Sequence, residues 1–285
     1  MHLKDWLDAY YFWITSIRNY VIERNIKFKS ERLHSSRNKL YSPTAYVIDR
    51  VNSPILGKSI ISRIILSSTD YPHTLRPYLD ENDIELILND APYSLPGILQ
   101  SIYSKIGHKV KKKICGDKSP NDLLAIQLFQ NLGLFNSEIK FIHIVRDVRG
   151  VVSSLLKVSW APDGIEKQFP RLWNYCNLHL YHEMRKKHNY MLLRYEDLVN
   201  DPAVAISSVA DFLGIAVHDE MLNEANRGVS LRHLPHHSNL SRPYLAFRSN
   251  AWMNELPISV KKTCEISALE GLSTFGYIKT GEIGL

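Results

Sequence analysis

The chain has 285 residues, of which 45% are hydrophobic and 22% are charged. This composition is typical of a folded globular protein and excludes a mainly disordered chain. The net charge of +6 favours anionic partners, but the basic residues are scattered rather than gathered in one block, so we expect no nucleic-acid partner. The three cysteines are widely spaced and have no histidine at zinc-ligand spacing, so we predict neither a disulfide framework nor a metal site.

The first 43 residues are predicted to form an N-terminal helix and a linker. Apolar residues recur at helical spacing over residues 3–27, which indicates an amphipathic helix. We favour a helix docked on the main domain, with contact to a membrane surface or a second copy as the alternatives. The apolar stretch 10–17 is too short to cross a bilayer and no secretory signal is seen. We therefore predict a soluble, cytoplasmic protein without a transmembrane segment, whose main domain spans residues 44–285.

Strands and helices alternate along this main domain. We expect strands over residues 45–51, 113–115, 140–145 and 190–194, and helices over residues 57–66, 122–132, 151–156, 173–187, 203–213 and 259–274. This order favours an α/β fold of a single domain, with a central, mainly parallel sheet flanked by helices. Ligands of such sheets bind beyond the carboxyl ends of the strands.

The segment VNSPILGKS at 51–59 lies between a predicted strand and a predicted helix. Gly57 allows close backbone approach, while Lys58 and Ser59 add a cation and a hydroxyl at a helix N-terminus, which favours anions. The segment nearly matches the P-loop pattern GxxxxGKS, but Asn52 replaces the first glycine. We interpret it as a P-loop-like phosphate-binding loop; an ordinary strand–helix turn is the alternative.

A second strand end carries a lysine in the sequence CGDKSP at 115–120. Pro120 followed by Asp122 suits the start of a helix. Lys118 would then point toward the same crevice, whereas the alternative is an exposed lysine in a turn.

The third strand end is the sequence FIHIVRDVRGVVSS at 141–154. An arginine directly after a buried strand is costly unless it serves an anion or an ion pair. Arg146 and Ser154 are therefore candidates to clamp one phosphate, with the guanidinium as a bidentate fork. A structural Arg–Asp pair is the alternative.

The fourth strand end is the sequence RYEDLVNDP at 194–202. We expect Tyr195 to face an adenine. Glu196 and Asp197 are expected to tie loops together or to cap the following helix.

At these residues the chain resembles the sulfotransferases that use 3'-phosphoadenosine 5'-phosphosulfate (PAPS), over roughly residues 46–277. The sequence RDVRGVVSS at 146–154 is similar to the family's 3'-phosphate motif R-D-x-R-x-V-x-S-S, and YEDL at 195–198 to its Y-E-D-L segment. GDKSP at 116–120 resembles the family's lysine turn, and Trp252 with Leu256 its W-x-x-x-L element. The resemblance implies the P-loop-like sulfotransferase fold.

The 5'-phosphosulfate loop departs from the family pattern V-G-x-P-R-S-G-T-[ST]-L-L. Ile55 replaces its basic residue, and Lys58 stands three positions further on, where a threonine is usual. We favour a loop in which Lys58 supplies the missing cation; a weakened donor site is the alternative. The resemblance then implies donor binding by Pro54, Gly57, Lys58, Ser59, Ile60, Arg146, Ser154, Tyr195 and Arg248.

The resemblance implies transfer of a sulfuryl group from PAPS to a hydroxyl or amine of a small-molecule acceptor. Lys118 and Lys58 would stabilise charge in the transition state, and no metal would be needed. Glu81 is our first choice for the general base, with His73 and Asp80 as the alternatives. The cluster His233, His236 and His237 is more consistent with a solvated or acceptor-lining loop than with metal ligands.

The acceptor pocket is expected to be lined by two irregular segments, 72–100 and 160–171. Two other functions remain open. One is a P-loop kinase that uses ATP and magnesium, which the GKS sequence at 57–59 suggests. The other is a non-catalytic nucleotide-binding protein on the same scaffold, which the unusual Ile55 suggests.

Overall fold

The computed structural model describes residues 62, 66, 75–92, 95–116, 123, 126, 130, 135, 138–158, 161, 163–223 and 246–278. These residues belong to two compact units, one within residues 21–133 and one formed by the described residues after 134. We call them the helix-pair unit and the C-terminal unit and describe each by itself. The predicted N-terminal helix and linker lie outside the described residues, so the boundary at residue 43 stays a prediction.

The helix-pair unit contains α5 (Glu81–Asp90) and α6 (Leu95–Val110). Asp80 begins α5 with a capping box: its carboxylate accepts from the backbone N–H of Asp83, 2.9 Å away, and Asp83 accepts in return from the N–H of Asp80. The two helices share one apolar cluster, formed by Leu79, Ile84, Ile87, Leu88, Ala91, Ile98 and Ile102. The prediction of an irregular segment over 72–100 is therefore wrong, because this apolar spacing builds two packed helices.

The predicted strand over residues 113–115 is also wrong. Helix α6 continues to Val110, and Lys111 then takes a left-handed conformation with φ 54°. The N–H of Lys112 turns back to the carbonyl of Gly107 at 2.9 Å. This ending of the helix leaves residues 113–116 without strand pairing.

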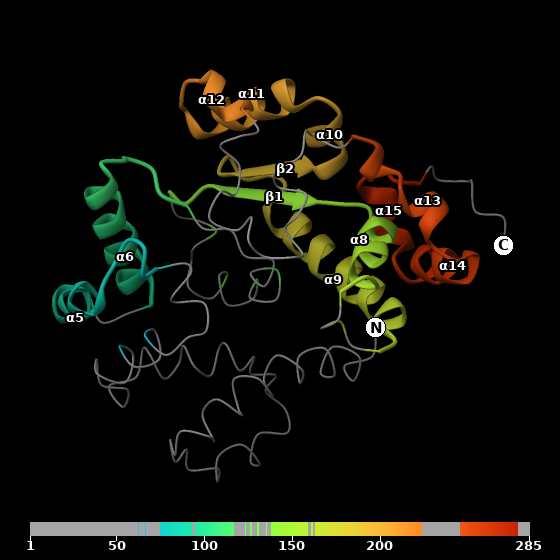
Figure 1. Ribbon diagram of the computed structural model, residues 1–285, viewed down its shortest axis with the longest axis horizontal. Coiled ribbons are helices and arrows are strands. Elements are labelled where there is room, and N and C mark those ends of the chain that lie inside the picture. Colours follow the sequence, from blue (N-terminus) through green and yellow to red (C-terminus); the bar gives the residue numbers. More distant parts are fainter. Residues whose placement is uncertain are drawn as a thin grey trace, which may run out of the picture. The chain divides into compact units, whose positions relative to one another are not determined.

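The C-terminal unit is built on the strands β1 (Phe141–Val145) and β2 (Tyr190–Arg194). They pair in parallel, with Phe141 opposite Tyr190 and Val145 opposite Arg194, which confirms both strands and the parallel sheet. Figure 1 shows β1 and β2 side by side, with α8 (Val148–Leu155) and α9 (Ile165–Met184) in the connection between them. The predicted α/β fold class is confirmed.

Both connecting helices begin earlier than predicted. The carboxylate of Asp147 accepts from the N–H of Arg149 at 2.8 Å, and this cap starts α8 at Val148 instead of residue 151. Helix α9 starts at Ile165, eight residues before the predicted start, and Pro170 lies inside it. Residues 165–171 are thus helical rather than part of an irregular acceptor loop.

The chain after β2 continues through α10 (Tyr195–Asn200), α11 (Pro202–Leu213) and α12 (Asp219–Leu222). Helix α11 agrees with its prediction to within one residue, because both of its ends carry clear signals. Asp201 caps the start through the N–H of Val204, and Gly214 closes the end with φ 72°.

The C-terminal segment contains the 3₁₀ helix η7 (Ala246–Ser249) and the helices α13 (Trp252–Glu255), α14 (Ile258–Ser267) and α15 (Leu269–Thr274). The single helix predicted over 259–274 is wrong, since Ala268 leaves the helical conformation with φ −127° and ψ 24°. These helices pack on α8 and α9 in one core, which contains Val145, Val148, Val152, Trp173, Leu178, Trp252, Leu256, Cys264, Ala268, Leu272 and Phe275.

Helix α15 approaches α9 closely at Gly271. A Cβ at this position would lie 2.7 Å from the Trp173 ring and 2.8 Å from Oδ1 of Asn174. The same Oδ1 accepts from the N–H of Gly271 at 2.7 Å. Only glycine allows this contact without displacing α9. In the part of the chain that the structure describes, no helix is both long and apolar enough to cross a membrane.

Candidate functional site

Arg146 follows β1 directly, where a parallel strand ends. Its Nη1 lies 3.4 Å from Oγ of Ser154, which is near the end of α8. The Ser154 hydroxyl donates to the carbonyl of Gly150 at 3.0 Å. A Cβ on Gly150 would lie 3.2 Å from Nε of Arg146. The absence of a side chain at Gly150 therefore lets the guanidinium lie along α8, and the structure brings Arg146 and Ser154 together.

No carboxylate of the described residues forms an ion pair with the guanidinium of Arg146. It lies over the ring of Tyr195, with 4.5 Å between Cζ and the ring centroid. Its Nε is buried and has no hydrogen-bond partner among the described residues. A buried donor without a partner is rare in folded proteins. The buried Nε therefore keeps Arg146 as the candidate ligand for an anion that the sequence predicts.

The structural Arg–Asp pair near this site is made by Arg149 instead. Arg149 and Asp147 are both buried, and Nη2 lies 2.7 Å from Oδ2 of Asp147; Nη1 also reaches Glu265 at 2.9 Å. Burial works to lower the pKa of Arg149, but the hydrogen bonds and charges of Asp147 and Glu265 together outweigh it, so the pKa is raised. Arg149 also lies over the Trp252 ring, with 4.0 Å from Cζ to the centroid. It thereby fixes α13 against α8.

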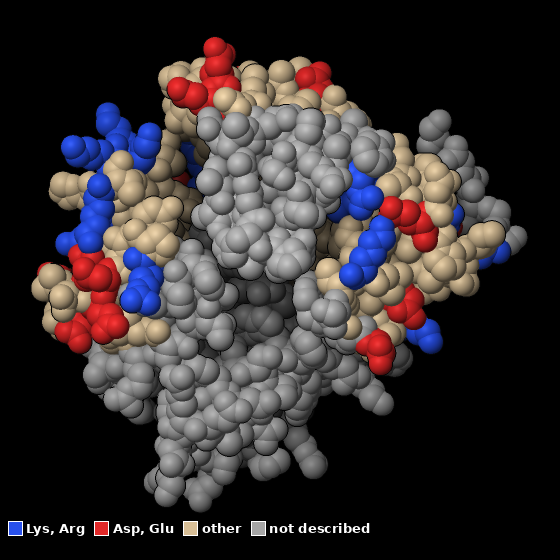
Figure 2. Space-filling model, in the orientation of Figure 1, with Lys and Arg blue, Asp and Glu red and all other residues tan. Residues whose placement is uncertain are grey.

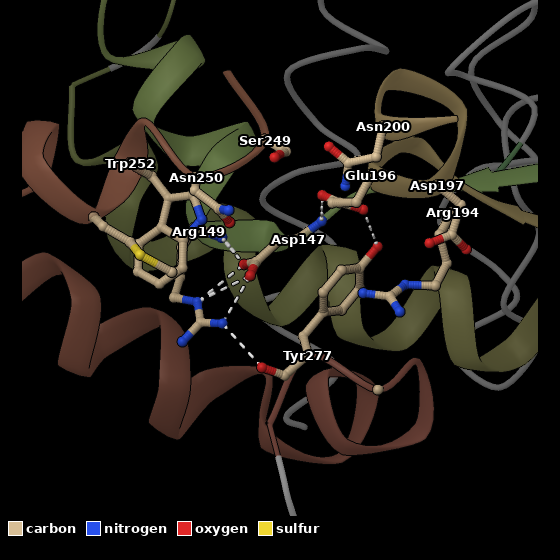
Figure 3. A pocket seen from close by; sticks show the side chains of 12 residues that line it. Asp147, Arg149, Arg194, Glu196, Asp197, Asn200, Ser249, Asn250, Trp252 and Tyr277 are labelled. Atoms are coloured by element: carbon tan, nitrogen blue, oxygen red, sulfur yellow. Dashed lines mark hydrogen bonds and ion pairs between the residues drawn. The ribbon is translucent and has the colours of Figure 1, made fainter. Parts of the chain in front are cut away.

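Glu196 ties three parts of the C-terminal unit together. It accepts from the N–H of Asp147 at 3.1 Å and from the hydroxyl of Tyr277 at 2.7 Å. Figure 3 shows this chain of contacts, with Arg194 beside the Tyr277 ring. The loop-tying role expected for Glu196 is confirmed, and its neighbour Tyr195, the first residue of α10, is thereby held next to Arg146.

A pocket of about 320 Å³ adjoins these contacts (Figure 3). Its walls come from α10, from η7 with the residue after it, and from the turn after α15, which we call the C-terminal turn; they include Asn200, Asn250 and Gly276.

The arginines at the ends of β1 and β2, Arg146 and Arg194, have the same arrangement. Each guanidinium lies 4.5 Å from a tyrosine ring, and each Nε is buried without a hydrogen-bond partner among the described residues. Only the first arginine was predicted as a site residue.

Arg248 lies on η7 and its Nη1 is 3.1 Å from Oε1 of Glu255. The other oxygen of Glu255 accepts from Oγ of Ser153 and from Nζ of Lys157, both at 2.7 Å. The hydrogen bond from Lys157, with that from Ser153, lowers the pKa of Glu255 to about 2. Figure 2 shows basic and acidic side chains interleaved over this part of the surface. Arg248 is thus paired locally.

The predicted general bases divide between the described and undescribed residues. Asp80 is the N-cap of α5, and its carboxylate is used in the capping box. Glu81 is exposed in the first turn of α5. His73, the catalytic candidate Lys118, the loop residues Pro54–Ile60 and the three loop histidines lie outside the described residues, so their roles stay predictions.

Sequence reasoning missed Arg194, Lys157 and Glu255. Arg194 had the signal that marked Arg146, a charged side chain at the end of an apolar strand. No local sequence signal marks Lys157 or Glu255, because their ion pair joins residues that lie 98 positions apart in the chain. No group of three or more His, Cys, Asp or Glu side chains suited to a metal ion occurs within the described segments.

The C-terminal unit is an α/β structure in which Arg146 directly follows a parallel strand and keeps a buried Nε without a hydrogen-bond partner among the described residues. The family model of the sulfotransferase domain matches residues 70–238. The chain belongs to this sulfotransferase family.

Curated proteins with similar sequences are also sulfotransferases. Mouse (Mus musculus) sulfotransferase 2A6 is 29% identical over 126 residues, which is 39% of this chain and 44% of that protein. Human (Homo sapiens) sulfotransferase 2A1 is 28% identical over 139 residues, 43% of this chain and 47% of that protein. The chain thus matches less than half the length of these curated relatives.

Among solved structures, the sulfotransferase domain from the Synechococcus PCC 7002 olefin synthase superposes with a TM-score of 0.56. The match covers 75% of this chain and 79% of that domain at 20% identity. At this identity the likeness shows the fold.

Proposed function

We propose that the chain transfers the sulfuryl group of PAPS to a hydroxyl or amine of a small-molecule acceptor. The family supports sulfuryl transfer, and the observation that carries the choice of donor is the environment of Arg146. Its buried Nε has no partner, its Nη1 faces Ser154, and no carboxylate of the described residues pairs with it. A phosphate monoester would supply this arginine with the partner it lacks, because it carries hydrogen-bond acceptor oxygens and negative charge.

PAPS carries such a phosphate at its 3' position, and ATP does not. In the proposed site Arg146 and Ser154 bind the 3'-phosphate. Tyr195 lies under the guanidinium and contacts the adenosine, and the contacts of Glu196 with Asp147 and Tyr277 keep both groups in place. Arg248 is a further ligand of this phosphate. Pro54, Gly57, Lys58, Ser59 and Ile60 form the proposed loop for the 5'-phosphosulfate.

The reaction is an in-line displacement. The acceptor oxygen or nitrogen forms a bond to sulfur while the bond from sulfur to the 5'-phosphate oxygen breaks, and adenosine 3',5'-bisphosphate leaves. A general base takes the acceptor proton, and Glu81 is the proposed base. Lys118 and Lys58 stabilise the negative charge of the bridging and sulfuryl oxygens. Sulfuryl transfer resembles phosphoryl transfer in that alignment and charge stabilisation supply most of the catalysis.

The test compares two nucleotides that differ only in the 3'-phosphate, adenosine 3',5'-bisphosphate and AMP. A charge-assisted hydrogen bond is worth about 1.5–3 kcal/mol, so Arg146→Ala should weaken binding of the bisphosphate roughly 10- to 100-fold and that of AMP much less. Calorimetric titration measures both affinities. Arg185→Ala is the matched control, since Arg185 is an exposed arginine over another tyrosine ring, that of Tyr181. Equal losses for both nucleotides would remove the 3'-phosphate assignment.

Activity requires its own measurement. Labelled sulfate from PAPS should appear on a phenol, alcohol or amine from an acceptor panel, without added magnesium. Magnesium-dependent transfer from ATP would instead support a kinase. Bisphosphate binding with no transfer to any acceptor would support a non-catalytic protein.

A further inference from the structure

Lys157 lies one turn beyond Ser154 at the end of α8. The N–H of Lys157 donates to the carbonyl of Ser154 at 3.3 Å, which continues the helical turn by one step. Residues three apart on such a turn share a face. Lys157, in the turn that follows α8, therefore lies on the same side as Ser154.

The ammonium of Lys157 and the guanidinium of Arg248 meet at one carboxylate. Glu255 is 2.7 Å from Nζ of Lys157 and 3.1 Å from Nη1 of Arg248. It also accepts from Ser153, the residue before Ser154, which is buried. Glu255 thus joins η7 to the end of α8, and it holds two cations beside Ser153, the neighbour of Ser154 in the sequence.

The charges in this group do not balance. Arg146, Lys157 and Arg248 contribute three positive charges, and within the described segments Glu255 is the one carboxylate that pairs with any of them. The neighbouring Arg149 differs, because two carboxylates compensate it. The excess of two positive charges matches the charge of a phosphate monoester near pH 7, which is about −1.5 to −2.

We infer that Lys157 is a third cationic ligand of the 3'-phosphate, held in position by Glu255 when the nucleotide is absent. This inference rests on the proposed function, because it adds a residue to the phosphate site of Arg146 and Ser154. Lys157 has a long, flexible side chain that is about half exposed (49%), so its ammonium can turn from Glu255 to a phosphate without a change in the backbone. Its contribution is selectivity for nucleotides with a 3'-phosphate.

The experiment measures the ratio of the affinities for adenosine 3',5'-bisphosphate and AMP. Lys157→Ala should lower this ratio roughly tenfold, and Lys157→Arg should retain most of it. Lys262→Ala is the control for net charge, because Lys262 is exposed on α14; it should leave the ratio unchanged. An unchanged ratio in Lys157→Ala would overturn the inference.

A second comparison separates a ligand from a purely structural partner of Glu255. Lys157→Ala is made both in the native chain and in the Glu255→Gln variant, where the carboxylate that anchors Lys157 is gone. A direct phosphate ligand lowers the ratio in both backgrounds. No further loss in the Glu255→Gln background would show that Lys157 acts only through Glu255 and would refute the inference.

The Arg146→Ala variant distinguishes a failure of the inference about Lys157 from a failure of the proposed function. If Arg146→Ala lowers the ratio and Lys157→Ala does not, the 3'-phosphate site stands and the inference about Lys157 fails. If neither variant lowers the ratio, the proposed function itself fails.

Discussion

The hydroxyl of Tyr277 donates to Oε2 of Glu196 across 2.7 Å, although 81 residues separate the two in the chain. The same hydroxyl lies 3.2 Å from the carbonyl of Val145, the last residue of β1. Burial is the main reason that the pKa of Tyr277 is raised, followed by the charge of Glu196. The phenol thus stays protonated and joins the C-terminal turn to the strand end from which Arg146 projects.

Tyr277→Phe removes this donor from two acceptors, the carboxylate of Glu196 and the carbonyl of Val145, and both residues are buried. We expect the free energy of unfolding to fall by about 1–3 kcal/mol, because an unmade hydrogen bond to a buried carboxylate costs roughly this amount. Urea unfolding measures the change. Tyr175→Phe is the control: Tyr175 is 42% exposed, and its hydroxyl makes no hydrogen bond to the described residues, so a loss of equal size there would contradict the explanation.

Glu255 should make the free energy of unfolding depend on pH under acidic conditions. Its pKa in the folded protein is about 2, below the ordinary value of 4.5, so its stabilising contribution is complete above about pH 4.5 and is lost as the pH falls toward 2. The stability difference between the native chain and Glu255→Gln should therefore shrink over this interval.

Chemical denaturation at a series of pH values tests this dependence. Glu270→Gln serves as the control because Glu270 is exposed in α15 and has no described ion pair. A stability difference for Glu255→Gln that stays constant from pH 5 to pH 2 would disprove the acid dependence.

The three cysteines should differ in reactivity. Burial raises the pKa of both Cys176 and Cys264 to about 12, whereas Cys115 is partly exposed. Since the thiolate is the reactive form, a thiol reagent at pH 8 should modify Cys115 and spare the other two until the protein unfolds. Mass spectrometry should find one adduct in the native state and three in urea. Rapid labelling of Cys264 in the native state would show that its core position is wrong.

Gly271→Ala should destabilise the contact between α15 and α9. The added methyl group would lie 2.7 Å from the Trp173 ring, and overpacking of this kind costs about 1–3 kcal/mol. Gly116→Ala is a matched substitution, since nothing lies within 4 Å of the added Cβ there. The thermal midpoint should fall for the first variant and change little for the second. Equal midpoints would argue against the close helix contact.

The sequence predicted those elements whose signals are local. Both strands are short apolar runs that end in a charged residue or just before one, and α11 has an Asp–Pro start and a glycine end. The break at Ala268 escaped prediction because neither glycine nor proline marks it. The start of α9 was predicted eight residues too late, and α9 accommodates Pro170 inside its second turn.

In the candidate site, too, only the contacts between residues close in sequence could be predicted. Arg146 and Ser154 could be predicted because they lie only eight residues apart in the sequence, on one strand–helix connection. The partner of Arg149 at Glu265 lies 116 residues away, and that of Glu196 at Tyr277 lies 81 residues away. No periodicity or spacing encodes such pairs, because they form only when the C-terminal helices dock.

This docking has a consequence for how the protein is made. Val145, Val148 and Val152 share one buried cluster with Trp173 and Leu178 of α9 and with Trp252, Leu256 and Leu272 of the last helices, so part of the apolar cover of this core is missing until the last helices have been synthesised. A nascent chain that contains β1, α8 and α9 but not α13 to α15 exposes the apolar side chains that those helices would cover. Its closure is therefore a late event, and premature termination before residue 252 would yield a chain that depends on chaperones or is degraded.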